Sequence, residues 1–200
     1  MIVYYFCVLA VRFLCRLLYH HRLYGKENVP KGAAIIAPNH VSHLDPAIVG
    51  AYWPEKIRFF ARDTLFTGFM GWLLPKLQVY PIQREGADIK TMRQILNFLS
   101  EGEKVVLFPE GTRSLDGELQ KTQAGVAMLA QRAGVPIIPV YIAGTFDIMP
   151  PGTKPKLTGR ASSTIGKPIH PAAYSHLPKK EAQQAIMDEW TQAMQKLSNL

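Results

Sequence analysis

This sequence has few cysteines, no acidic residues in two segments, and no long uninterrupted apolar run. Its 200 residues include only Cys7 and Cys15, too few for a structural zinc site and, on one helix, too far apart for a disulfide. We therefore interpret both as small apolar residues of a protein from a reducing compartment. The sequence contains no low-complexity tract or internal repeat, and 48% of its residues are hydrophobic, which predicts one globular domain.

Acidic residues are missing from residues 1–26 and 154–180. The formal net charge is +8, and the basic excess therefore lies at the two flanks of the chain rather than in one arginine-rich helix. A positive charge of this size favours an acidic partner. Nucleic acid is the weaker choice, because the basic residues are not interleaved with aromatic ones on one face. An anionic membrane or a phosphorylated substrate fits better.

The most hydrophobic part of the chain is the N-terminal segment, residues 1–24. Arg12 interrupts it before the roughly 20 apolar residues of a simple transmembrane helix are reached, and it lacks the flanks of a signal peptide. The pattern predicts a membrane-associated helix lying in the interface, with Arg12 and Arg16 reaching the headgroups. The aromatic residues expected in lipid are Tyr4, Tyr5, Phe6 and Phe13. A helix packed on its own domain and a full span are the alternatives.

Beyond this segment, short apolar runs alternate with helical patterns. The expected strands are residues 32–39, 57–62, 78–84, 104–110 and 136–144. The expected helices are residues 64–77, 88–101, 122–134 and a last one from about Lys179. Pro81 places the third strand at a sheet edge. The alternation predicts an α/β fold: a single domain, residues 25–200, with a largely parallel central sheet flanked by helices.

The stretch "NHVSHLDP", residues 39–46, follows the first expected strand. Asp45 and Pro46 form a good helix start, with aspartate as the N-cap. A loop between strand and helix can fold His40 back against Asp45, whose carboxylate would orient the imidazole as a general base. Two other interpretations remain open, namely a plain helix cap and a metal site of His40, His43 and Asp45. The metal site lacks a second cluster of ligands.

A second polar motif, "FPEGTRS" at residues 108–114, ends another expected strand. Gly111 lets backbone and ligand approach closely, and Thr112 offers a hydroxyl. Arg113 can bind a phosphate through two hydrogen bonds. Glu110 can accept hydrogen bonds from a polyol or orient Arg113.

Arg84, in "VYPIQR", ends a third expected strand. Because parallel strands end at the same edge of a sheet, His40, Arg84 and Arg113 are expected to lie at one rim, where open α/β sheets bind ligands. This convergence predicts a basic catalytic group beside an anion pocket.

"NHVSHLDP" and "FPEGTRS", in this order and spacing, resemble the first and third signature blocks of the glycerolipid acyltransferases, in particular the bacterial 1-acylglycerol-3-phosphate type. "VYPIQR" is similar to the second block and "VPIIPV", residues 135–140, to the fourth. The likeness extends over roughly residues 24–170. Gln83 and Tyr80 depart from it, because many members carry aspartate or asparagine and glycine there.

The resemblance implies transfer of a fatty acyl group from acyl-CoA or acyl-carrier protein to the sn-2 hydroxyl of lysophosphatidic acid, giving phosphatidic acid. It implies that His40 is the catalytic base and that Asp45 orients it, without metal or cofactor. The residues expected to bind the acceptor are Arg84, Glu110, Gly111, Thr112 and Arg113. The expected location is the cytoplasmic face of the cell membrane, where the enzyme would be monotopic or peripheral on an anionic phospholipid surface.

Three alternatives stay open. The acceptor can be glycerol 3-phosphate or another lysolipid on the same enzyme. The fold can serve a membrane-binding protein that does no chemistry. A metal-dependent lipid phosphate hydrolase would use the histidines as ligands, and a chelator assay separates it from an acyltransferase.

Overall fold

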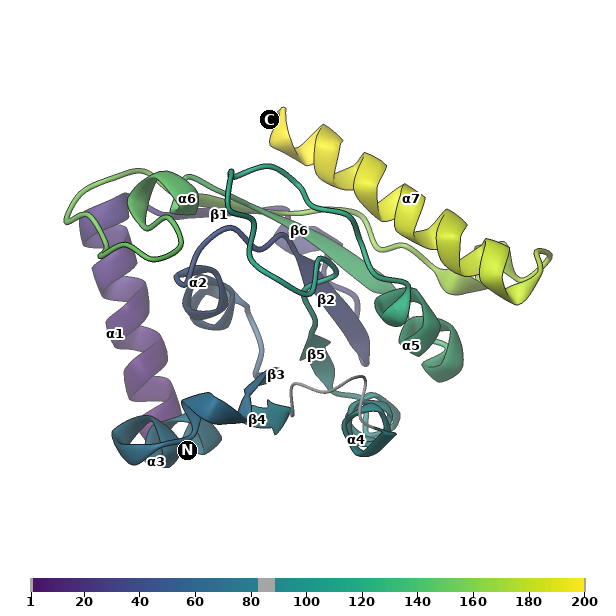
Figure 1. Cartoon of the computed structure of the whole chain (residues 1–200), viewed down its shortest axis with the longest axis horizontal. Coiled ribbons are helices and arrows are strands. Elements are labelled where there is room, and N and C mark those ends of the chain that lie inside the picture. Colours follow the sequence, from purple (N-terminus) through teal and green to yellow (C-terminus); the bar gives the residue numbers. More distant parts are fainter. Residues whose placement is uncertain (1, 83–88, 200) are drawn as a thin grey trace.

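A seven-stranded sheet forms the centre of the molecule (Figure 1). The structure, a computed structural model, describes residues 2–82 and 89–199. The strands are β1 (Arg22–Tyr24), β2 (Ala34–Pro38), β3 (Ile57–Arg62), β4 (Val79–Ile82), β5 (Lys104–Val106), β6 (Ile137–Ala143) and β7 (Ser162–Ile165). They lie in the order β1-β7-β6-β2-β5-β3-β4, and each neighbouring pair is parallel except β6 and β7. The predicted α/β fold with a largely parallel sheet is confirmed.

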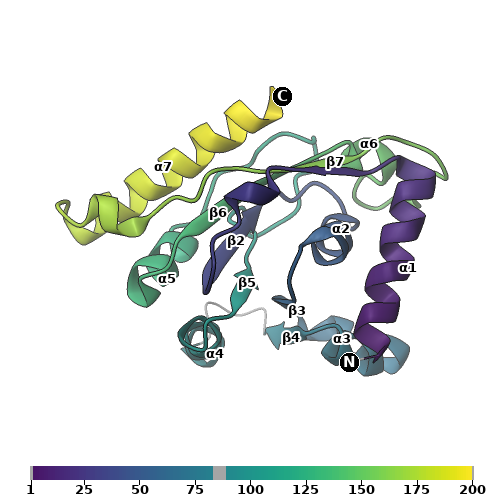
Figure 2. The ribbon, with the colours of Figure 1, turned by 180° about the vertical axis from the view of Figure 1, so that it is seen from behind.

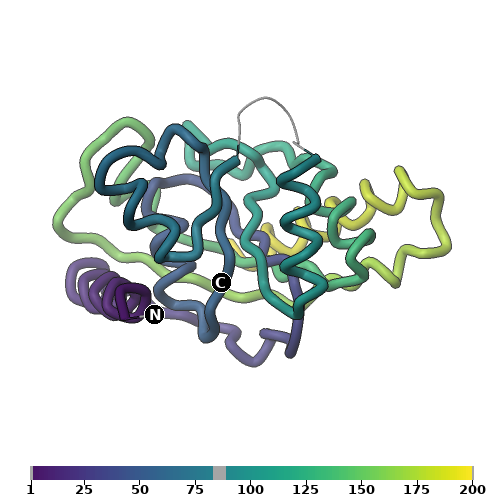
Figure 3. The backbone as a smooth tube through the Cα atoms, turned by 90° about the horizontal axis from the view of Figure 1, so that it is seen from below, coloured from purple at the N-terminus to yellow at the C-terminus, as the bar shows by residue number. Residues whose placement is uncertain are grey.

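Helices cover both faces of this sheet. They are α1 (Ile2–Tyr19), α2 (Asp45–Tyr52), α3 (Gly68–Lys76), α4 (Ile89–Ser100), α5 (Gly125–Ala133), α6 (Thr145–Ile148) and α7 (Lys179–Ser198), with 3-10 turns η1 (Lys26–Asn28), η2 (Asp63–Leu65) and η3 (Pro171–Tyr174). The helices α4, α5 and α7 lie on one face and α2 on the other, with α1 packed against α2 (Figure 2). Seen from below, α1 lies at one end of the molecule, and α7 runs from the other end back toward the middle (Figure 3).

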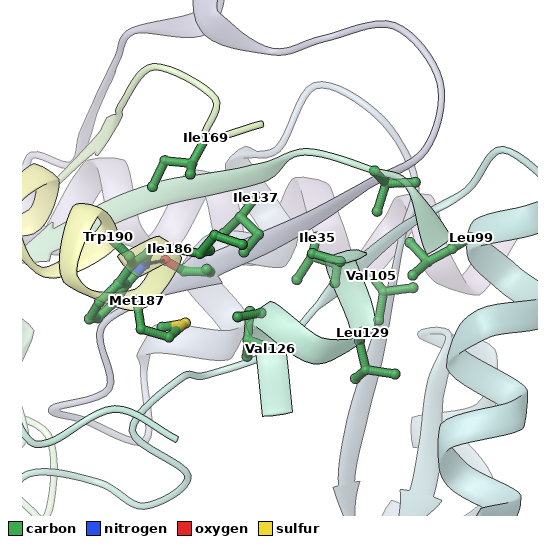
Figure 4. Close-up of a cluster of buried hydrophobic side chains, with 14 of the residues drawn as sticks. Ile35, Leu99, Val105, Val126, Leu129, Ile137, Ile169, Ile186, Met187 and Trp190 are labelled. Atoms are coloured by element: carbon green, nitrogen blue, oxygen red, sulfur yellow. Dashed lines mark hydrogen bonds between the residues drawn. The ribbon is translucent and has the colours of Figure 1, made fainter. Parts of the chain in front are cut away.

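The central strand β2 is buried on both of its sides. Ile35 and Ala37 point into a core shared with α4, α5 and α7, which includes Trp190 (Figure 4). Ala34 and Ile36 point into a second core shared with α2. A strand covered on both faces needs apolar residues at every position, which explains why its sequence is a continuous apolar run.

Several predicted boundaries differ from the observed ones. The strand expected at 104–110 ends at Val106, because Pro109 has no N–H to donate and Gly111 turns the chain with a φ of +71°. The helix expected at 64–77 is divided into η2 and α3. The short, largely polar strands β1 and β7 were not predicted. The strand β4 lies at an edge of the sheet, as Pro81 predicted.

The first helix is packed on the domain, and this corrects two expectations. The guanidinium of Arg12 donates a hydrogen bond of 2.9 Å to the carbonyl oxygen of Ala51 instead of reaching outward. Tyr4 is only 7% exposed, so it is covered by protein. Cys15 also belongs to a buried cluster with α2. Residues 22–24, which the sequence placed in a separate N-terminal segment, form β1 of the sheet.

The opposite side of α1 carries an exposed apolar stripe. Its members are Ile2, Tyr5, Phe6, Leu9, Phe13, Leu14 and Leu17. In the described part of the chain, α1 is the one helix that length and composition would allow to cross a membrane. Three more exposed apolar side chains, Phe69, Met70 and Trp72, lie on α3. The segment around α3 is therefore largely a surface element rather than a core helix.

Candidate functional site

The first polar motif folds back on itself at the carboxyl end of β2. Two residues after the strand, Nδ1 of His40 lies 3.0 Å from Oδ2 of Asp45, the first residue of α2. The Asp45 carboxylate is fully buried, whereas 17% of the His40 side chain is exposed. The ring of His40 stacks on Phe108, with centroids 4.1 Å apart. One edge of the imidazole is thus held while the ring remains accessible.

Asp45 was predicted to cap α2, and this prediction is wrong. The N-cap position is Leu44, without a side-chain hydrogen bond to the helix. The carboxylate of Asp45 instead accepts hydrogen bonds from the backbone N–H groups of Val41 and Ser42, at 2.8 and 2.7 Å. Its second oxygen accepts one from the hydroxyl of Thr145, at 2.7 Å. These donors suit an ionised carboxylate, which can only accept hydrogen bonds.

This arrangement defines the tautomer of His40. Because the carboxylate of Asp45 accepts, Nδ1 of His40 carries the proton and Nε2 presents a lone pair. A neutral imidazole held in this way can take a proton from a hydroxyl group placed at Nε2.

The second motif is joined to the first by backbone hydrogen bonds on both sides of His40. Glu110 accepts one from the N–H of His40 at 2.7 Å, and the N–H of Ser114 donates one to the carbonyl oxygen of His40 at 2.8 Å. The other oxygen of Glu110 accepts from the N–H of Gln120. Glu110 is 4% exposed, and burial raises its pKa. It therefore holds the two loops together, and among the described residues it forms no hydrogen bond or ion pair with Arg113, which was one of the two roles that the sequence suggested for it.

Arg113 is placed at the rim by a contact with His43, three residues after His40. Its guanidinium donates a hydrogen bond to Nε2 of His43, and burial together with the nearby positive charge of Arg113 lowers the pKa of His43. Thr112 and Gly111 lie exposed beside it. Gly111 has a φ of +71°, a left-handed backbone conformation in which any other side chain is strained, so this turn favours glycine. The structure thus brings His40, Asp45 and residues 110–113 together.

Arg84 lies outside the described residues. Within residues 2–82 and 89–199, no three His, Cys, Asp or Glu side chains are grouped so as to hold a metal ion. His43, a potential ligand in the metal interpretation, faces Arg113 instead.

Two residues of the site were missed from the sequence. Thr145, the first residue of α6, is fully buried against Asp45. The side chain of Asn39 bonds to both the N–H and the carbonyl oxygen of Ile142, at 2.7 and 3.0 Å, and fixes the end of β2 to β6. Asn39 could have been predicted as a site residue, because it directly precedes His40 in the sequence. Thr145 could not, because its partner Asp45 is 100 residues away.

A histidine–aspartate pair and an arginine on joined loops, at the carboxyl edge of a parallel sheet, define a site for base-assisted chemistry on an anionic substrate. The chain belongs to the Acyltransferase family, whose pattern matches residues 20–143.

The individual relatives have consistent names. The chain is 30% identical over 199 residues to the 1-acyl-sn-glycerol-3-phosphate acyltransferase of Bacillus subtilis, covering 98% of this chain and 97% of that protein. It is 31% identical over 158 residues to the chloroplastic LPAT1 enzyme of Arabidopsis thaliana with the same activity name, covering 76% of this chain but 44% of that protein.

Among solved structures, the 1-acyl-sn-glycerophosphate (LPA) acyltransferase PlsC from Thermotoga maritima matches with a TM-score of 0.79 and 25% identity. The match covers 98% of this chain and 78% of that one. The likeness therefore includes nearly the whole chain described here, α1 among it.

Proposed function

We propose that this protein transfers a fatty acyl group from an acyl thioester to the sn-2 hydroxyl of 1-acylglycerol 3-phosphate, producing phosphatidic acid for phospholipid synthesis. The names of the relatives in Bacillus and Thermotoga support this reaction. The observation that carries the proposal is the oriented imidazole of His40, joined through its own backbone to the loop that bears Arg113.

His40 acts as the general base. Its Nε2 takes the proton of the sn-2 hydroxyl, and the oxygen attacks the carbonyl carbon of the thioester to form the new C–O bond. The tetrahedral intermediate collapses, the C–S bond breaks, and the imidazolium returns its proton to the departing thiolate. Asp45 stabilises the imidazolium and keeps the ring in place. No acyl-enzyme is needed, because the acceptor hydroxyl attacks directly.

The acceptor phosphate is held by Arg113, with Arg84 as the second cation. A guanidinium matches a phosphate through two parallel hydrogen bonds, which positions the glycerol as well as binding it. Thr112 and the exposed backbone at Gly111 line the glycerol pocket. Glu110 contributes indirectly by fixing the backbone on which His40 stands.

A panel of substrates tests this function directly. Purified protein in detergent is given acyl-CoA or acyl-carrier protein as the donor, and lysophosphatidic acid, glycerol 3-phosphate or another lysolipid as the acceptor. We expect phosphatidic acid from lysophosphatidic acid and none from the His40→Ala variant. A His40→Ala protein with the wild-type rate, or a wild type without transfer to any acceptor, refutes the proposal.

The enzyme works on the cytoplasmic face of the cell membrane, where it meets its apolar substrates. The exposed apolar stripe of α1 and the exposed side chains of α3 supply the surface that lies in the lipid. Arg12 does not take part as a headgroup ligand, because its guanidinium is bound to Ala51.

Point substitutions test this attachment better than deletion, since Cys15 and Tyr19 of α1 belong to a buried cluster. The double variant Phe6→Gln, Phe13→Gln changes two side chains that are 71% and 66% exposed. We expect it to sediment with vesicles much less than the wild type. The matched control Ile89→Gln, Leu115→Gln changes exposed apolar residues outside α1 and α3 and is expected to sediment normally. Equal sedimentation of all three proteins contradicts attachment through α1.

A further inference from the structure

A basic cavity of about 770 Å³ lies between α1, β1 and the end of α2. Its lining includes the cations Arg12, Arg16, Arg22 and Lys26 and the histidines His20 and His21. Among the described residues that line it, none is aspartate or glutamate. A neighbouring cavity of about 590 Å³ shares His20 and Arg22 and adds Arg160. Positive charge is therefore concentrated around one hollow of the surface, a concentration that attracts an anion.

Most of this charge is not used inside the protein. The side chains of Arg16, Arg22 and Lys26 are exposed. Within the part of the chain that the structure describes, these three side chains form no hydrogen bond or ion pair. Arg12 differs, because it donates to the carbonyl oxygen of Ala51. Three cations around the cavity are thus available to a ligand.

A buried histidine beside these cations also lacks one partner. His21 is 2% exposed, and its Nε2 lies 3.0 Å from Oγ of Ser163. Its Nδ1 is buried without a hydrogen-bond partner among the described residues. Such orphaned atoms are rare in native proteins, and each requires an explanation such as a ligand. The preceding residue, His20, has a left-handed backbone with a φ of 47°, uncommon outside glycine and found at functional turns.

This cavity is separate from the site of His40. It is lined by Tyr52 at the end of α2, whereas Asp45 stands at the beginning of that helix. The rise of an α-helix puts the two ends of α2 about 10 Å apart along its axis. The cavity therefore belongs to a different part of the surface from the proposed acceptor pocket.

The apolar stripe of α1 leads directly to the basic cavity. Leu9 and Phe13 are exposed on this stripe, and Arg16 stands one turn further along the same side, shortly before the helix ends at Tyr19. An anionic phospholipid has the same order of parts, with acyl chains followed by a phosphate. A soluble phosphate would have no need of the apolar half of this surface.

We propose that the basic cavity binds the phosphate of an anionic phospholipid headgroup in the membrane on which the enzyme works. This inference rests on the proposed membrane attachment and adds a specific headgroup site to it. Arg16, Arg22 and Lys26 contact the phosphate, and the His21 side of the cavity offers a further polar contact. The site orients α1, and with it the domain, on an anionic surface.

Vesicle binding of the full chain tests the site. Sedimentation is measured with phosphatidylcholine vesicles that contain or lack phosphatidylglycerol. We expect the wild type to bind the anionic vesicles more tightly than the neutral ones, and the gain is the ratio of the two affinities. In the triple variant Arg16→Gln, Arg22→Gln, Lys26→Gln, which we call the pocket variant, we expect this ratio to fall by about tenfold or more. The control Lys167→Gln, Lys180→Gln, Lys196→Gln loses the same charge from exposed positions outside the cavity and is expected to keep most of the gain. The charge-conserving variant Arg16→Lys, Arg22→Lys is expected to keep most of it too.

Four results would overturn the inference. The first is an equal loss in both triple variants, which indicates diffuse attraction instead of a site. The second is a pocket variant that binds anionic vesicles like the wild type. The third is pocket-dependent binding of soluble glycerol 3-phosphate without an effect on vesicles. The fourth is pocket-dependent binding of an acidic acyl-carrier protein, again without an effect on vesicles.

Activity in detergent separates this inference from the proposed reaction. The pocket variant is expected to transfer acyl groups in micelles at the wild-type rate, because its three substitutions lie away from His40. A wild type without acyl transfer that still binds anionic vesicles through the cavity refutes the reaction and leaves the headgroup site standing.

Discussion

The hydroxyl of Thr145 donates a hydrogen bond of 2.7 Å to Oδ1 of Asp45, although the two residues are 100 positions apart. Both side chains are fully buried. The other oxygen of Asp45 faces Nδ1 of His40, so Thr145 holds the carboxylate from behind while the carboxylate holds the imidazole. Thr145 is thus a positioning residue at the end of a chain of hydrogen bonds that leads to the proposed base.

Replacing Thr145 with valine should lower kcat with little effect on the KM of either substrate. The buried oxygen of Asp45 loses its partner and the imidazole loses its orientation, for which a fall of about tenfold to a hundredfold is reasonable. Steady-state kinetics on the purified variant provide the measurement. Thr145→Ser restores the hydroxyl and should recover most of the rate. If the serine variant is as slow as the valine variant, Thr145 acts through packing instead.

Asp45→Asn should reduce kcat by about a thousandfold or more, as expected when a buried carboxylate that orients a catalytic histidine is neutralised. An asparagine also offers one oxygen where Val41, Ser42, His40 and Thr145 together require two. Single-turnover measurements on a variant with an unchanged circular dichroism spectrum isolate the effect on chemistry. A rate near that of the wild type would mean that His40 needs no oriented carboxylate.

Arg113→Ala should raise the KM for lysophosphatidic acid by about tenfold to a hundredfold, because one charged hydrogen-bonding partner of the phosphate is removed. The KM for the acyl donor should stay nearly constant. His43→Gln is the matched control, since it removes the neighbour of Arg113 but keeps the guanidinium. If both substitutions raise the KM for lysophosphatidic acid equally, the loop conformation rather than the guanidinium of Arg113 is what binds the acceptor.

The buried His21 should make the protein less stable in mild acid. Burial lowers its pKa from 6.5 to about 4 in the folded state, so between these values the unfolded chain binds a proton that the native state does not. The free energy of unfolding therefore falls as pH drops from 6.5 to 4, by about 3 kcal/mol in total. Urea unfolding of the wild type and of His21→Gln at several pH values measures this contribution. The difference between the two proteins should shrink toward pH 4, and a difference that is constant with pH contradicts it.

The sequence by itself determined the general fold and the rim at which the site lies. Continuous apolar runs such as residues 34–38 and periodic ones such as residues 89–100 depend on local spacing, and strand and helix follow from that spacing. The carboxyl ends of parallel strands share one edge, so the meeting of His40 with residues 110–113 could be predicted from the fold class. Pro81 marked an edge strand because proline has no backbone N–H to donate to a neighbouring strand.

Only the tertiary structure decided which contacts complete the site and which way α1 faces. Thr145 reaches the Asp45 carboxylate through a pairing across 100 residues, for which local sequence carries no signal. Arg12 points inward because Ala51 at the end of α2 has a carbonyl oxygen without a partner inside its own helix. The sequence pattern of α1 does not show where α2 lies, so this contact could not be predicted from it. Local periodicity fixes what each segment is, whereas long-range packing fixes what each side chain touches.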